Sequence, residues 1–201
     1  MSPAASGESR AAKAREVLEW CRHAHYKMRS NPTGPDWVLI WAGTIALLRA
    51  VGHTLDKEDG ARDARLQKEQ RSWWEKLKHT KPDPAIFWDF IERDRNKLLK
   101  EAELTVEQSA EVFIQGASAT ALAGNLGRRQ EPPQSQPISS IYATRTGQED
   151  PRTPPPSAIY SYRMNSSPFI RQDPRDLVRD AIEWWEKQLS DIEQKATAAR
   201  P

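Results

Sequence analysis

An apolar run at residues 37–48, WVLIWAGTIALL, is the feature that most limits what this chain can fold into. The run carries no charge, so a helix built from it is apolar on every side, and such a helix belongs in the middle of a bundle. The run meets Arg49 after twelve residues. That length is too short to span a bilayer, which favours a buried core helix and no membrane association.

Four other segments repeat apolar residues at helical spacing, and eight tryptophans, most of them in helical segments, supply bulk for packing between helices. With the run above they predict five helices, at residues 8–29, 37–55, 64–79, 84–103 and 174–196. Asp36, Asp83 and Asp173 stand where an aspartate can cap the first N–H groups of a helix. Residues 56–63 are expected to be a charged connection.

Prolines and short β-prone runs mark the stretch before the last helix. Seven of the fifteen prolines fall at residues 132–156, and the β-prone runs lie at 111–115, 138–143 and 158–164. A flexible linker is expected at 124–137. The predicted fold is therefore mainly α, an antiparallel bundle of about five helices with a small β- and proline-rich insertion before the last helix. Its parts are a disordered tail at 1–7, a four-helix core at 8–103, the insertion at 104–172, a closing helix at 173–196 and a tail at 197–201.

Charge and cysteine content narrow the class of protein. The net charge of +2 is small and the two signs are interleaved, which argues against strong nucleic-acid or membrane binding. The single cysteine, Cys21, fits a reducing compartment, and we expect a cytoplasmic protein. Cys21 and His25 have the spacing of a helical ligand pair, but no second pair completes a zinc site. No metal or cofactor is predicted.

The segment at residues 88–101, WDFIERDRNKLLKE, places Asp94 and Arg95 on the apolar face of its helix. Inward charges need partners. If this helix neighbours residues 37–55, Arg49 can pair with Asp94 or Glu101, so that Arg49, Asp94, Arg95 and Glu101 form a structural ion-pair network between helices. The alternative is a cleft in which Arg95 stabilises charge on a phosphodiester and His53 moves a proton.

ERDRNKLLKE near the end of a helix in an all-α bundle resembles the arginine-asparagine helix of HEPN-type domains, through Arg95 and Asn96. That resemblance implies a bacterial toxin–antitoxin or defence setting and an RNA-cleaving pattern completed by a histidine five to seven positions after the arginine. Lys100, Glu101 and Ala102 stand there instead, so the resemblance favours a non-cleaving relative.

Two functions follow from these residues. The first is a non-catalytic helical-bundle protein that binds a protein partner or itself, as a homodimer, through its surplus tryptophan surface or the proline-rich segment. The second is a HEPN-like ribonuclease that acts on RNA through Arg95 with His53 or Asn96. The candidate catalytic residues are thus Arg95, Asn96, His53 and Arg49, and the first function is the one we expect.

Overall fold

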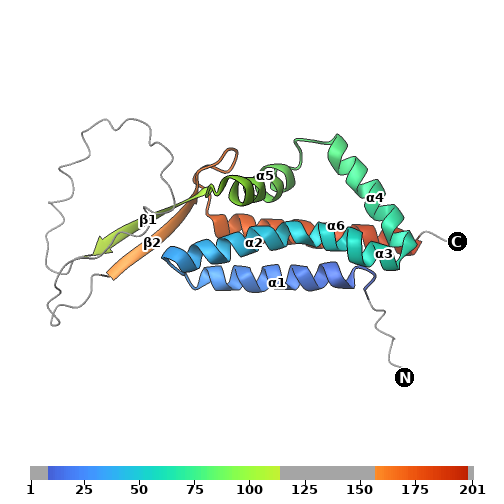
Figure 1. The fold of residues 1–201 in the computed structure, drawn as a ribbon, viewed down its shortest axis with the longest axis horizontal. Coiled ribbons are helices and arrows are strands. Elements are labelled where there is room, and N and C mark those ends of the chain that lie inside the picture. Colours follow the sequence, from blue (N-terminus) through green and yellow to red (C-terminus); the bar gives the residue numbers. More distant parts are fainter. Residues whose placement is uncertain (1–8, 114–156, 199–201) are drawn as a thin grey trace, which may run out of the picture. The chain divides into compact units, whose positions relative to one another are not determined.

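The computed structural model describes residues 9–113 and 157–198 of the 201-residue chain. The chain divides into two compact units, with the divisions between Gln108 and Ser109 and between Ser161 and Tyr162. The larger unit contains all the described helices (Figure 1). It therefore takes in part of the stretch at 104–172 that the sequence assigns to the insertion.

The larger unit is a bundle of five helical runs within the residues that the structure describes. Four of them are α1 (Ala12–Arg29), α2 (Gly34–Thr54), α4 (Ala64–His79) and α6 (Pro174–Ala198). The fifth alternates π- and α-helical turns, in the order η2 (Ile86–Glu92), α5 (Arg93–Asn96) and η3 (Lys97–Glu101). Two antiparallel strands, β1 (Val106–Phe113) and β2 (Ser157–Met164), precede α6 in the chain. The predicted fold class is confirmed.

The prediction of a charged connection at residues 56–63 is wrong. Helix α2 continues through a π-helical turn, η1 (Leu55–Asp59), into α3 (Gly60–Arg62). Leu55 and Asp59 are four residues apart and both are buried, so this segment has an inward face that packs and keeps it helical. The helix therefore continues past the predicted end at residue 55.

The extended helix meets the length and composition of a membrane span. It runs over Gly34–Arg62, and its most apolar window has a mean hydropathy of 1.5. A core helix of a soluble protein meets the same criteria. In this bundle α1 and α2 lie side by side and antiparallel, and α6 packs against both (Figure 1). The apolar side chains of Trp41, Ile45 and Leu48 are buried there.

Charged residues join α1 to α6 along one edge of that contact. The Arg15 guanidinium donates to Glu186 through Nη1 at 2.6 Å and to Glu193 through Nη2 at 2.5 Å. Arg22 reaches Glu186 through Nη2 at 2.7 Å. These bonds between the first and last helices fix how the two lie along one another.

Helix starts follow the predicted caps in one case of three. Asp173 Oδ1 accepts from the Arg175 N–H at 2.8 Å at the start of α6, as expected. Asp36 lies inside the first turn of α2, because the helix begins earlier, at the glycine and proline that follow Thr33. Asp83 stands outside the fifth run, which begins after Ala85. Asp63, which the sequence analysis did not single out, caps α4.

The strands overlap two of the three predicted runs. β2 matches the run at 158–164, and β1 begins before the run at 111–115. The Ser109 and Ser161 hydroxyls face each other across the strands at 2.6 Å. The run at 138–143 and the linker at 124–137 lie outside the described residues. In the larger unit, the Tyr162 ring stacks on Trp37 with centroids 3.6 Å apart, and its hydroxyl donates to the Pro32 carbonyl at 2.6 Å.

Candidate functional site

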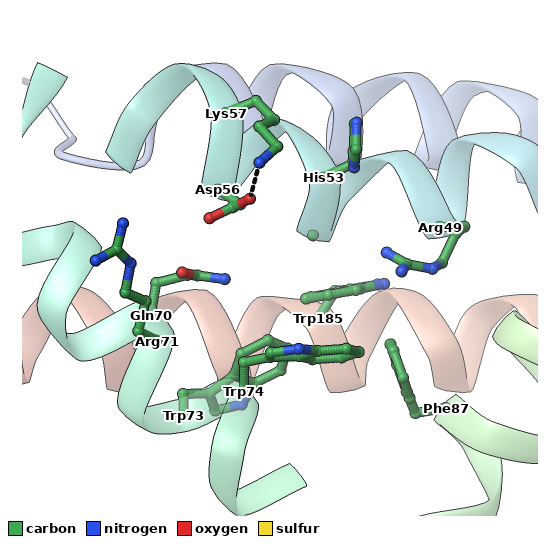
Figure 2. A pocket seen from close by; sticks show the side chains of 11 residues that line it. Arg49, His53, Asp56, Lys57, Gln70, Arg71, Trp73, Trp74, Phe87 and Trp185 are labelled. Atoms are coloured by element: carbon green, nitrogen blue, oxygen red, sulfur yellow. Dashed lines mark ion pairs between the residues drawn. The ribbon is translucent and has the colours of Figure 1, made fainter. Parts of the chain in front are cut away.

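A cavity of about 280 Å³ opens between α2, α4, η2 and α6 (Figure 2). Its wall is mainly aromatic, and basic side chains stand around its edge. The aromatic rings belong to Trp73, Trp74, Phe87 and Trp185, and the basic groups to Arg49, His53, Lys57 and Arg71. The cavity therefore combines flat apolar surface with positive charge.

The aromatic wall is built by residues from three helices. Trp73 and Trp74 come from α4, Phe87 from η2 and Trp185 from α6. The Phe87 ring meets Trp74 edge-on at 5.8 Å and Trp185 edge-on at 6.1 Å between centroids. Trp73 lies 5.7 Å from Trp185. Such spacings are those of attractive aromatic pairs, so the rings hold one another in place.

Gly52 on α2 allows this wall to approach the helix. A Cβ atom at Gly52 would lie 2.7 Å from Cη2 of Trp185, which is closer than a side chain tolerates. The glycine is therefore required where α2 crosses the rigid Trp185 ring. In Figure 2 this ring is seen edge-on between α2 and Trp74.

Arg49 is held at one end of the cavity by a carboxylate and two rings. Its Nε donates to Glu92 Oε2 at 2.5 Å, and its guanidinium carbon lies 5.9 Å from the ring centroids of both Trp74 and Phe87. These contacts combine an ion pair with cation–π attraction. The Arg49 guanidinium is thus held in one orientation, and the Glu92 carboxylate offsets part of its charge.

The other charged groups are less constrained. Lys57 pairs with Asp56 at 2.9 Å. His53 is exposed, four residues after Arg49 on the same helix. Arg71 is exposed at the opposite end of the cavity from Arg49 (Figure 2). Within the described part of the chain its guanidinium makes no ion pair.

Two polar atoms in the cavity wall have no hydrogen-bond partner. They are the Gln70 side-chain oxygen and the Trp185 indole nitrogen, on residues that are 6% and 0% exposed. Buried polar groups are nearly always paired, because leaving one unpaired destabilises the fold. Two residues that line the cavity therefore each hold a buried polar atom, one acceptor and one donor, that has no partner in the described part of the chain.

The predicted candidates separate into two places. Arg49 and His53 line the cavity, whereas Arg95 and Asn96 do not. Arg95 Nη1 donates to Asn96 Oδ1 at 3.0 Å, and Asn96 Nδ2 reaches Glu92 Oε1 at 3.4 Å. Glu92 thus links Arg49 to this pair. Arg49 pairs with Glu92 rather than with Asp94 or Glu101, because the π-helical turns of the fifth run shift its side chains from ideal α-helical register.

Asp94 points inward, as the sequence indicates, but its surroundings are different from those expected. It is 1% exposed and neither carboxylate oxygen has a hydrogen-bond partner at bonding geometry. Burial raises the pKa of Asp94 to about 6, although the Thr105 and Ser166 hydroxyls and the charge of Arg93 oppose this rise. Glu101 is exposed at the end of η3.

No metal centre is found in the described ranges 9–113 and 157–198, where no three histidine, cysteine or acidic side chains gather. Cys21 is buried, and burial raises the pKa of its thiol to about 12. A thiol with that pKa is protonated at neutral pH and is a poor metal ligand.

Gly52, Gln70, Arg71 and the pairing of tryptophans around them were not predicted from the sequence. The two Trp-Trp pairs, Trp73-Trp74 and Trp184-Trp185, were the available signal, because both occur on amphipathic helices whose apolar stripes cannot bury two adjacent rings equally. Comparison of the chain with family models, with curated proteins and with solved structures returns no match, so the resemblance to HEPN-type domains rests on Arg95 and Asn96.

Proposed function

We propose that this chain is a non-catalytic helical-bundle protein that acts by binding a protein partner or a second copy of itself. The supporting observation is that α1 leaves two aromatic side chains open to solvent, Trp20 at 52% and Tyr26 at 67% exposure. Tryptophan and tyrosine are enriched among the residues that contribute most to protein–protein binding. The setting we propose is the bacterial toxin–antitoxin or defence context of the domains that this chain resembles.

The positions of the candidate catalytic residues also support a binding role. Cleavage of a phosphodiester needs a charge-stabilising group and a proton-transfer group at one place. Arg95 is hydrogen-bonded to Asn96 outside the cavity that His53 lines. Arg49, which does share the cavity with His53, is already paired with Glu92. Neither arginine therefore lies unpaired beside His53, where it could stabilise charge while the histidine moves a proton.

Site-specific photo-crosslinking from position 26 tests the binding proposal. A photoreactive phenylalanine analogue replaces Tyr26 in one variant and the exposed Arg62 in a control variant. We expect a crosslinked species from position 26 only, either a dimer of this chain or a complex identified by mass spectrometry. Sedimentation velocity of the unmodified protein separates the two cases. A monomer at all concentrations that yields equal crosslinking from both positions would exclude the proposal.

The ribonuclease function remains a second candidate because Arg95 and Asn96, the residues of the HEPN-like pattern, lie side by side and half-exposed. Incubation of purified protein with mixed RNA tests it, beside the variants Arg95→Ala and His53→Ala. Cleavage that both variants abolish would replace the binding proposal. Cleavage that survives both would come from a contaminant.

A further inference from the structure

We propose that the cavity between α2, α4, η2 and α6 binds a small planar aromatic ligand that carries a negative charge. A nucleoside monophosphate and an aromatic carboxylate share this chemistry. The site does not depend on Trp20 or Tyr26 on α1, so it can hold whether or not the chain binds a protein partner.

The shape and lining of the cavity select a flat ring. Its volume of about 280 Å³ is at the small end of ligand sites, which favours a single compact molecule. Trp73 and Trp74 are only half-buried, so parts of their rings are available to a ligand. Aromatic rings prefer offset or edge-to-face contact with other rings, and the neighbouring Phe87 and Trp185 already show such geometry.

The charges around the cavity select an anion. Among the residues that the structure describes, the basic groups of Arg49, Lys57 and Arg71 pair with only two carboxylates, those of Asp56 and Glu92. Arg71 has no carboxylate partner in the described chain, and its planar guanidinium suits a phosphate or carboxylate. His53 adds a group that becomes positive when protonated.

An unpaired wall atom can give the ligand a specific contact. The Gln70 side-chain oxygen can accept a hydrogen bond and has no partner among the described residues. It is sealed from solvent, and the Gln70 amide extends toward the middle of the cavity (Figure 2). Rotation of this flexible amide as a ring enters would expose the oxygen. An N–H group of a heteroaromatic ring can then donate to it.

Titration of the full chain followed through its indole N–H resonances in two-dimensional NMR tests this site. The probes are adenosine monophosphate and indole-3-acetate, with adenosine as the uncharged ring and inorganic phosphate as the ringless anion. We expect saturable shifts of the Trp74 and Trp185 resonances with at least one charged ring. Adenosine should bind about tenfold more weakly than its monophosphate, and phosphate should leave these indoles unchanged. Which charged ring binds identifies the source of the ligand.

Two variants on α4 separate site binding from general attraction to a basic protein. Arg71→Gln removes the unpaired charge at the cavity, and Lys68→Gln removes an exposed charge of the same helix outside it. Both positions are exposed, so both variants should fold, as circular dichroism would verify. We expect Arg71→Gln alone to weaken binding about tenfold. No indole shift with either charged ring at millimolar concentration, or equal weakening by both variants, would overturn the proposal.

Discussion

Asp59 and Asp94 are both buried, with 3% and 1% of their surfaces exposed, but their carboxylates have different surroundings. Asp59 accepts from two backbone N–H groups at the start of α1, from Lys13 at 3.0 Å and from Ala14 at 2.8 Å. Asp94 has no partner at bonding geometry for either oxygen. The Asp59 carboxylate accepts from the first N–H groups of α1. For the Asp94 carboxylate, almost nothing offsets the free-energy cost of burial.

The difference shows what makes a buried charge stabilising. The first N–H groups of a helix have no partner within it and carry partial positive charge. Ala11, the residue at the cap position of α1, has no side-chain acceptor, and Asp59, which follows Lys13 by 46 residues, supplies one. Hydroxyls near Asp94 reduce the penalty of burial without removing it. Two equally buried carboxylates can therefore differ in whether they stabilise the fold.

The largest effect is expected from Asp59→Ala. The change removes two hydrogen bonds to a charged acceptor and leaves the N–H groups of Lys13 and Ala14, the second of them buried, without this acceptor, which should lower the free energy of unfolding by about 3 kcal/mol. Urea denaturation followed by tryptophan fluorescence measures it. Asp56→Ala, three residues earlier, is the control, since in the described ranges the one ion pair of Asp56 is with exposed Lys57. A loss from Asp59→Ala no larger than that control would remove the contrast with Asp94.

Asp94→Asn should act in the opposite direction and stabilise the protein. A carboxyl whose pKa rises on folding holds its proton more tightly in the native state, so stability falls as the pH rises from about 4 to about 6. Above that range both states are ionised and the penalty is constant. We expect a gain of about 2 kcal/mol at about pH 8 and almost none at about pH 4.

Denaturation of Asp94→Asn and of the unsubstituted protein across this pH range measures the effect. Asp89→Asn is a matched control on η2, because Asp89 is part-exposed and paired with Arg93. Destabilisation by Asp94→Asn at the higher pH would mean that the carboxylate has a stabilising partner.

Arg15→Gln is expected to have a smaller effect, a loss of stability that grows as the pH rises. Burial opposes ionisation of Glu193, but hydrogen bonds from Arg15, Ser9 and the Ala11 N–H outweigh it and lower its pKa. A carboxyl with a lowered pKa stabilises the fold above its unfolded pKa, and this stability is lost as the pH falls. Arg15→Gln should therefore cost about 1 kcal/mol at neutral pH and less in acid.

Denaturation across the same pH range measures the effect of Arg15→Gln on stability. Arg62→Gln serves as its comparison, because Arg62 makes only an exposed pair with Glu58 at 3.4 Å. If Arg15→Gln cost as much in acid as at neutral pH, its contribution would be packing of the side chain rather than charge.

Local spacing accounts for much of what the sequence predicted. Helix α4 falls at the residues expected, and Asp94 points inward, because both follow from the 3.6-residue period. The hydroxyls near Asp94 come from Thr105 and Ser166, beyond the helix and far apart in sequence, so periodicity could not identify them. The pairing of Arg49 with Glu92 likewise depends on π-helical turns that the sequence pattern did not reveal.

The cavity could not be predicted from the sequence for a related reason. Gly52 mattered because of the ring that crosses it, and that ring belongs to Trp185 on the last helix. Gln70 matters because it finds no partner after three helices have packed. The close packing at Gly52 and the missing partner of Gln70 depend on side chains from several packed helices, so the sequence of one helix does not show them.

The bonds at the start of α1 also bear on how the chain assembles during synthesis. Asp59 satisfies Lys13 and Ala14, and Glu193 accepts from the N–H of Ala11 at 2.9 Å. Helix α1 is thus completed by residues that the ribosome adds much later than the helix itself. Until residue 193 has left the exit tunnel, part of the apolar face of α1 is uncovered and can bind chaperones or a neighbouring nascent chain.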